Sequence, residues 1–217
     1  TEVQALAAAH QELSKGRYFA VIIEPMQSEG GDRYATGRFH RALRLLTRHH
    51  RVPLIIDEVQ CGFGLGGGFA WHHRFGYIDA EGAPDTPDCV TFAKRAQVGV
   101  VMSRFKDPEP TSAHSASLIR GKLHADQMAD DTAASRLQGW VMPRLDAIAG
   151  RFNDLVANPR ACGNAFAFDM PSPQEMLAFL GQRFWRGVIV FGAGKQTIRY
   201  RLSSAFTEAD VDRIFDA

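Results

Sequence analysis

The stretch PLIIDEVQCGFG, from Pro53 to Gly64, places two carboxylates directly after an apolar run and ahead of a glycine-rich turn. A short apolar run bounded by a proline and by glycines predicts a strand that is buried on both faces of a parallel sheet. A carboxylate at the end of such a strand loses its hydration, which disfavours its charged form unless a cation faces it. Asp57 therefore predicts a positively charged group in a crevice at this edge of the sheet.

The residues before this stretch complete a parallel crossover unit. FAVIIEP (19–25) predicts another fully buried strand, QSEGGD (27–32) a loop, and the apolar stripe that follows Thr36 a helix that ends near His50. Strand, loop, helix and strand in this order place a ligand site at the carboxyl ends of the strands. An earlier amphipathic helix is expected to end at Gly16.

The order of the predicted helices and strands changes after a loop expected over residues 106–114. Strands are expected at 89–93 and 98–103 before this loop, and a helical region at 124–156, interrupted near Pro143, after it. A half-buried strand at 164–170, a helix at 173–186, strands at 188–192 and 197–203, and a helix capped by Thr207 follow. The sequence thus predicts an α/β domain with a mostly parallel sheet over 1–123 and a smaller α+β domain over 124–217.

Composition excludes several classes of protein. The chain has 217 residues, of which 45% are hydrophobic, and its net charge is +1, which favours neither nucleic acid nor a membrane as partner. Three separated cysteines indicate a reducing compartment, and we expect a cytoplasmic protein. Four histidines lack acidic or cysteine partners at ligand spacing, so we expect surface residues and no metal site; they are His49, His50, His72 and His73.

A lysine follows the next predicted strand, in TFAKRAQ, where Lys94 can reach the same crevice as Asp57. One carboxylate and one lysine suit pyridoxal phosphate chemistry, because the amine binds the cofactor as a Schiff base and the carboxylate keeps the ring nitrogen protonated. Two alternatives remain open at this point: Asp57 caps a turn, or Asp57 and Glu58 hold magnesium in an ATPase. The sequence has no GxxxxGK[ST] loop, which weakens the second alternative.

Four stretches, in this order along the chain, resemble the class III, fold-type I aminotransferases, which use pyridoxal 5'-phosphate. They are IIEPMQSEGGD (22–32), PLIIDEVQCGFG (53–64), PDCVTFAKRAQ (87–97) and TIRYR (197–201). FAKRAQVGVVMS (92–103) is most similar to the lysine 6-aminotransferases, with the 4-aminobutyrate and ornithine enzymes as close alternatives. The amino-terminal part of the family, with its Gly-Ser turn for the cofactor phosphate, is not found. The resemblance therefore implies an incomplete fold-type I large domain followed by the small domain.

The resemblance also implies roles for individual residues. Lys94 would carry the cofactor and Asp57 would pair with the ring nitrogen. Val59 would pack against the ring face, Gln60 would reach its phenolic oxygen, and Glu24 would support Asp57 from behind.

The remaining implied residues concern the cofactor phosphate and the substrates. A phosphate hydroxyl would come from Ser115 or Ser117, although neither is followed by the aromatic residue of the family pattern. Glu29 would pair with Arg199, and Arg201, on the same strand face, is left as an alternative. Such a pair would let one site accept both an ω-amine donor, such as L-lysine, and 2-oxoglutarate, in a homodimer. A noncatalytic, degenerate subunit is the rival interpretation.

Overall fold

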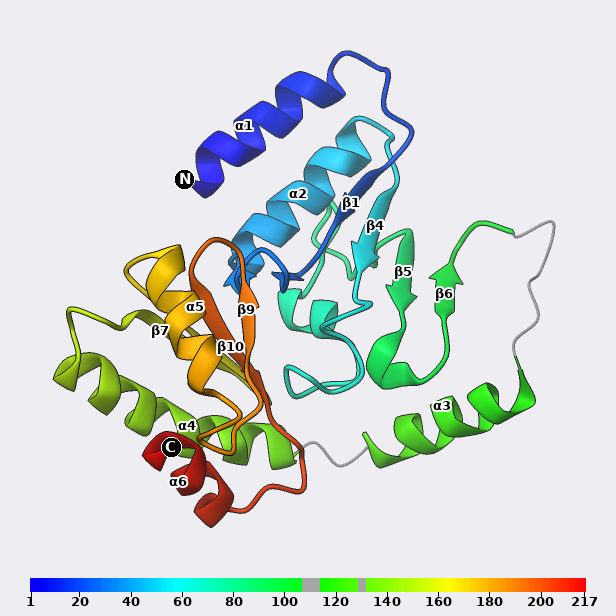
Figure 1. Ribbon diagram of the computed structural model, residues 1–217. Helices are drawn as coiled ribbons and strands as arrows, with labels where there is room; N and C mark the ends of the chain where they lie inside the picture. The colour runs from blue at the N-terminus through cyan, green and yellow to red at the C-terminus, as the bar shows by residue number, and fades with distance from the viewer. Residues whose placement is uncertain (107–113, 129–131) are drawn as a thin grey trace. The chain divides into compact units, whose positions relative to one another are not determined.

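The computed structural model describes residues 1–106, 114–128 and 132–217 (Figure 1). The chain forms two compact units. The first comprises Thr1–Met26, Tyr34–Phe63 and Phe69–Gln127, and the second comprises Gln27–Arg33, Gly64–Gly68 and Met128–Ala217. The domain boundary expected between residues 123 and 124 falls within helix α3 (Ser115–Gln127), and most of the loop expected over 106–114 lies outside the described residues.

The first unit contains a four-stranded sheet in the order β1-β4-β5-β6. Strands β1 (Val21–Ile23), β4 (Leu54–Asp57) and β5 (Cys89–Phe92) are parallel, and β6 (Val100–Ser103) runs antiparallel to β5. This arrangement confirms the predicted mostly parallel α/β sheet. The remaining elements of this unit are α1 (Glu2–Leu13), α2 (Gly37–His49), η1 (Trp71–Phe75) and η2 (Lys94–Ala96).

Helix α2 makes the crossover between β1 and β4, as expected, and packs against α1 (Figure 1). It begins where the sequence indicated, because the Thr36 side chain accepts a hydrogen bond from the Phe39 amide at 3.1 Å. Two short strands, β2 (Met26–Gln27) and β3 (Arg33–Tyr34), flank the stretch that was expected to be a loop throughout.

The burial expected of the first two strands is half right. Leu54 and Ile56, on one face of β4, are completely buried, whereas Ile55 on the other face is half-buried. The prediction of full burial is wrong for the stretch around β1, where Ile22 is 63% and Phe19 89% exposed. The reason is position in the sheet: among the described strands β1 is an edge that pairs with β4 alone.

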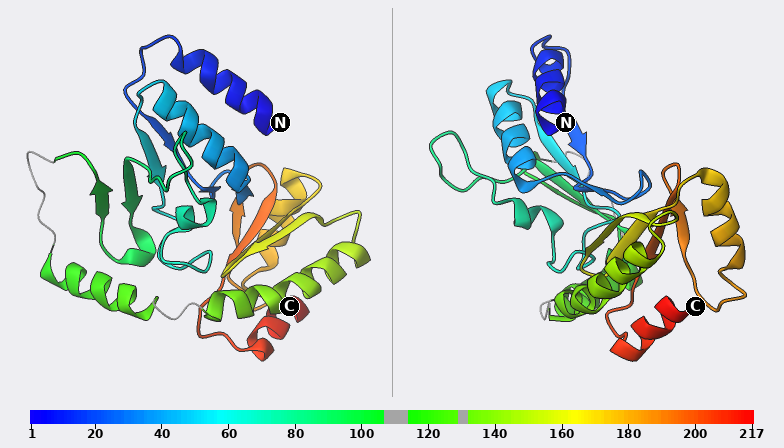
Figure 2. Two further views of the ribbon diagram at one scale, coloured as in Figure 1. Left: turned by 180° about the vertical axis from the view of Figure 1, so that it is seen from behind. Right: turned by 90° about the vertical axis from the view of Figure 1, so that its left-hand side faces the viewer.

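The second unit contains an antiparallel sheet in the order β7-β8-β10-β9 and three helices. The strands are β7 (Ala157–Cys162), β8 (Ala165–Asp169), β9 (Phe191–Ala193) and β10 (Thr197–Arg201), and the helices are α4 (Thr132–Arg151), α5 (Pro173–Gln182) and α6 (Glu208–Asp216). Apolar side chains from all three helices pack on one face of the sheet, and α6 lies beside α4 (Figure 2). The opposite face carries Arg199 and Arg201 of β10, beside the alanines of β8.

Two expectations for this unit are wrong. Helix α4 continues through Pro143, because Leu137, Val141 and Leu145 form a stripe of fully buried side chains whose packing offsets the missing backbone donor. Strand β8 is buried on both faces rather than one. Its apolar-core face carries phenylalanines, and on the other face Ala167 is fully buried and lies between two arginines of the neighbouring strands.

No helix in the described part of the chain is both long enough and apolar enough to cross a membrane.

Candidate functional site

The carboxyl ends of β4 and β5 bring Asp57 to the edge of the parallel sheet. Asp57 lies in register with Thr91 of β5. Its Oδ1 accepts hydrogen bonds from the Val59 amide at 3.0 Å and from the Thr91 hydroxyl at 3.3 Å. In the described part of the chain no hydrogen bond reaches Oδ2. One oxygen therefore fixes the carboxylate while the other can receive a protonated ring nitrogen, which fits the predicted cofactor.

Lys94 follows Thr91 by three residues, at the same edge of the sheet, and begins the short helix η2. Its backbone has a φ of 51°, in the left-handed region that lysine rarely adopts. The turn is closed by hydrogen bonds from the Ala96 amide to Ala93 and from the Gln97 amide to Lys94, at 3.0 and 2.9 Å. Lys94 is exposed, and no described carboxylate forms an ion pair with it. A strained backbone that presents an uncompensated amine is consistent with a cofactor-binding lysine.

Glu58, the residue after β4, has different hydrogen-bond partners from Asp57. Its two oxygens accept hydrogen bonds from the Trp71 and His72 amides at 2.6 and 2.8 Å and contact the His72 ring at 2.6 Å. Glu58 is thereby committed to holding the start of η1 and is not placed to share a magnesium ion with Asp57. The expectation that His72 is a surface residue is wrong, because this contact buries it.

The other three histidines of the prediction differ in exposure. His49 and His73 are exposed, and the half-buried His50 contacts the His10 ring, with Nε2 2.9 Å from Nδ1. Within the described ranges no group of three or more histidine, cysteine or acidic side chains could hold a metal ion.

The remaining residues expected around the cofactor lie in the first unit as well. Val59 and Gln60 follow Asp57 and are half-buried, as is Glu24 just beyond β1. Ser115 and Ser117 lie in the first turn of α3. Neither serine hydrogen-bonds to Asp57 or Lys94, so the structure does not bring the phosphate candidates into direct contact with the sheet edge.

The two arginines that the sequence could not distinguish have different partners on the polar face of the second unit. Arg199 donates a hydrogen bond from Nη2 to Glu29 Oε1 at 2.7 Å; the Glu29 side chain is 67% exposed. Arg201 donates two hydrogen bonds, at 2.6 and 2.7 Å, to the carboxylate of Asp32, which is fully buried. Arg199 therefore has the partner that can move into solvent, whereas Arg201 belongs to a fixed ion pair.

A third arginine on this face was missed by the sequence analysis. Arg160 of β7 donates to the carbonyl oxygens of Gly31 and Asp32 at 2.5 and 3.0 Å, and to Asp169 Oδ1 at 2.8 Å. Burial opposes ionisation of Asp169, but hydrogen bonds from Thr197 and Arg160 outweigh burial and lower its pKa. Alternation in ANPRAC could have placed Arg160 on a strand face, but nothing local indicated its partners.

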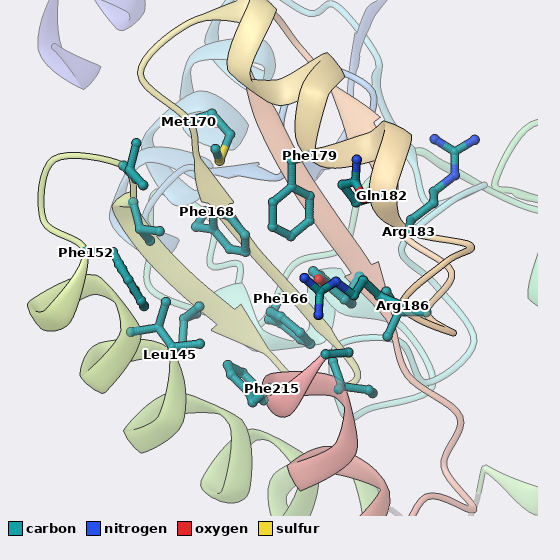
Figure 3. A pocket seen from close by; sticks show the side chains of 17 residues that line it. Leu145, Phe152, Phe166, Phe168, Met170, Phe179, Gln182, Arg183, Arg186 and Phe215 are labelled. Atoms are coloured by element: carbon teal, nitrogen blue, oxygen red, sulfur yellow. The ribbon is translucent and has the colours of Figure 1, made fainter.

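An apolar pocket of about 370 Å³ lies on the opposite, helix-covered face of the same sheet (Figure 3). Phe166, Phe168, Phe179 and Phe215 line it, and Arg186 extends across it. None of the residues predicted to bind cofactor or substrate lines this pocket. It is continuous with the apolar core of the second unit and separate from the polar face that carries the ion pairs.

Comparison with known proteins identifies the family. The family model for class III aminotransferases matches residues 1–217. The chain belongs to the class III aminotransferases. It is 31% identical over 208 residues to the L-lysine-epsilon aminotransferase of Mycobacterium bovis and 31% identical over 194 residues to the 4-aminobutyrate aminotransferase of Dictyostelium discoideum. These matches cover 88% and 83% of this chain but 44% and 38% of the relatives, so the chain spans less than half of their length.

A solved relative shows the same fold. The lysine aminotransferase from Mycobacterium tuberculosis in the internal aldimine form superposes with a TM-score of 0.87 at 27% identity. The superposition covers 99% of this chain and 52% of that protein. These findings confirm the predicted family and an incomplete fold-type I architecture, and pyridoxal phosphate is the cofactor of this family.

Proposed function

We propose that this chain forms part of an aminotransferase that moves an amino group from an ω-amine donor, such as the side-chain amine of L-lysine, to 2-oxoglutarate. The observation that carries the proposal is the placement of Asp57 and Lys94 at the ends of adjacent parallel strands. The names of the relatives support both a lysine and a 4-aminobutyrate donor, and an ornithine donor is the third candidate. The enzyme would act as a cytoplasmic homodimer.

The residues at the sheet edge have separate roles in this proposal. Bound pyridoxal phosphate supplies an electron sink for the negative charge that develops on the substrate carbon. Asp57 keeps the ring nitrogen protonated through Oδ2 while Val59 and Thr91 hold Oδ1. Lys94 would hold the cofactor through its amine and would move a proton at the substrate carbon.

The other cofactor contacts are assigned by family resemblance and position. Val59 would pack against the ring, Gln60 would bind its phenolic oxygen, and Glu24 would support Asp57. Ser115 or Ser117, at the start of α3, would contribute a hydroxyl to the phosphate.

Substrate alternation would depend on Glu29 and Arg199. With an ω-amine donor bound, Glu29 neutralises Arg199 through their 2.7 Å hydrogen bond. With 2-oxoglutarate bound, Glu29 swings into solvent and the guanidinium binds the substrate carboxylate through two parallel hydrogen bonds. The exposure of Glu29 supports this role for Arg199, and the buried Asp32 partner argues against it for Arg201.

Separate half-reactions test the proposal. In the holoenzyme, Glu29→Gln should slow the half-reaction with L-lysine about tenfold, because the hydrogen bond from Arg199 then lacks a negatively charged acceptor, and change the 2-oxoglutarate half-reaction by less than about twofold. Stopped-flow absorbance of the cofactor measures both rates. Glu81→Gln, an exposed loop carboxylate, is the matched control. Equal effects on the two half-reactions would contradict the proposed switch, and absence of any half-reaction would favour a noncatalytic subunit.

A further inference from the structure

The loop that carries Glu29 is attached to the sheet of the second unit through its backbone. The Gly194 amide donates to the Glu29 carbonyl oxygen at 2.8 Å. The Arg160 guanidinium donates to the next carbonyls along the loop, those of Gly31 and Asp32. These contacts use backbone atoms of the loop, whereas the Glu29 carboxylate accepts a hydrogen bond from Arg199.

Two glycines allow the loop to approach the sheet this closely. Gly31 has a φ of 110°, and a Cβ there would lie 2.7 Å from Thr197 Oγ1. A Cβ at Gly194 would lie 2.8 Å from the Gly30 carbonyl oxygen. The loop backbone therefore rests directly on the sheet surface, with no room for side chains between them.

Arg160 occupies a particular place on that surface. It lies opposite Ala167 of β8, and Ala167 lies opposite Arg199 of β10, so the two arginines belong to one cross-strand row separated by a small side chain. Asp169 fixes the Arg160 guanidinium at 2.8 Å and accepts a hydrogen bond from the Thr197 hydroxyl at 2.6 Å. Arg160 is thus oriented by the sheet and spans from it to the loop.

We propose that Arg160 is a positioning residue for the Glu29–Arg199 ion pair. It fixes the loop backbone, so that opening and closing of the pair require only rotation of the Glu29 side chain. Without Arg160 the loop gains backbone freedom, which must be lost again whenever Glu29 covers Arg199, and this ordering cost weakens the pair. The inference rests on the proposed function of Glu29 but is tested on the pair itself.

Chemical modification of Arg199 by phenylglyoxal measures how well Glu29 covers it and needs neither cofactor nor turnover. Peptide mass spectrometry gives the rate at Arg199 relative to the exposed Arg38 in the same sample. Loss of the Glu29 hydrogen bond in Glu29→Ala should raise the relative rate about fivefold. Arg160→Met should raise the relative rate about threefold, because it weakens the Glu29–Arg199 hydrogen bond without removing it. In the Glu29→Ala background, Arg160→Met should add nothing, because there is no carboxylate left to position.

Further variants separate positioning from a general loss of structure. Arg213→Met removes an exposed arginine of the same unit and should leave the Arg199 rate unchanged. Arg160→Lys should give an intermediate rate, because one ammonium cannot reach both loop carbonyls and Asp169. If Arg160→Met does not fold, the Arg199 rate in Arg160→Lys tests the positioning role in its place. A normal Arg199 rate in the Arg160 variants, or an equal increase in the Glu29→Ala background, would overturn the inference. No increase in Glu29→Ala itself would instead overturn the proposed role of Glu29.

Discussion

The two arginines of β10 should differ sharply in their contribution to stability. Arg201→Met leaves the carboxylate of Asp32 fully buried without its two hydrogen bonds, which should lower the free energy of unfolding by about 3 kcal/mol. Arg199→Met frees the carboxylate of Glu29, whose side chain is 67% exposed and can be hydrated. This substitution should therefore cost about 1 kcal/mol or less.

Urea unfolding followed by far-UV circular dichroism measures both changes. Addition of Asp32→Asn to Arg201→Met should recover part of the loss, because the uncompensated buried charge is then removed. Asparagine suits the site, since Asp32 has a positive φ of 48°. Similar losses for Arg199→Met and Arg201→Met would refute the distinction between a movable and a fixed ion pair, and with it the assignment of Arg199 as the carboxylate binder.

Two further predictions concern the first unit. Burial lowers the pKa of His40 from 6.5 to about 4, so the unfolded chain takes up a proton at a higher pH than the folded chain does. The free energy of unfolding should therefore fall by about 2 kcal/mol between pH 7.5 and 5. Urea unfolding of His40→Leu should show a clearly smaller fall over the same range. Arg44 is fully buried between Asp85 and Asp88, so Arg44→Met should cost about 3 kcal/mol, against less than about 1 kcal/mol for the more exposed Arg48→Met. Equal pH dependence with and without His40, or equal losses for the two arginines, would contradict these expectations.

Local patterns were sufficient to predict much of the fold. The apolar run before Asp57 predicted β4, and Thr36 predicted the start of α2. Thr207 predicted the start of α6, and its side chain accepts a hydrogen bond from the Asp210 amide. Each of these signals depends on neighbours within a few residues. The exposure of β1 and the continuity of α4 through Pro143 depend instead on sheet position and tertiary packing, which no local pattern carries.

The candidate site was predictable to a similar extent. Asp57 and Lys94 follow from the rule that ligands bind at the carboxyl ends of parallel strands. Arg199 and Arg201 share a strand face, and only their partners in the structure distinguish them. Arg160 was missed because its partners in the Glu29 loop lie more than 120 residues away, at sequence separations of 128 and 129.

Lys94 is proposed as the amine that binds the cofactor beside Asp57. Borohydride reduction of the chain after incubation with pyridoxal phosphate, followed by peptide mass mapping, tests it directly, because reduction leaves a stable pyridoxyl group on the reacting lysine. The label should lie chiefly on Lys94, with weaker labelling in Asp57→Asn and none at this position in Lys94→Arg. Labelling spread evenly over exposed lysines such as Lys15 and Lys122, without preference for Lys94, would contradict it.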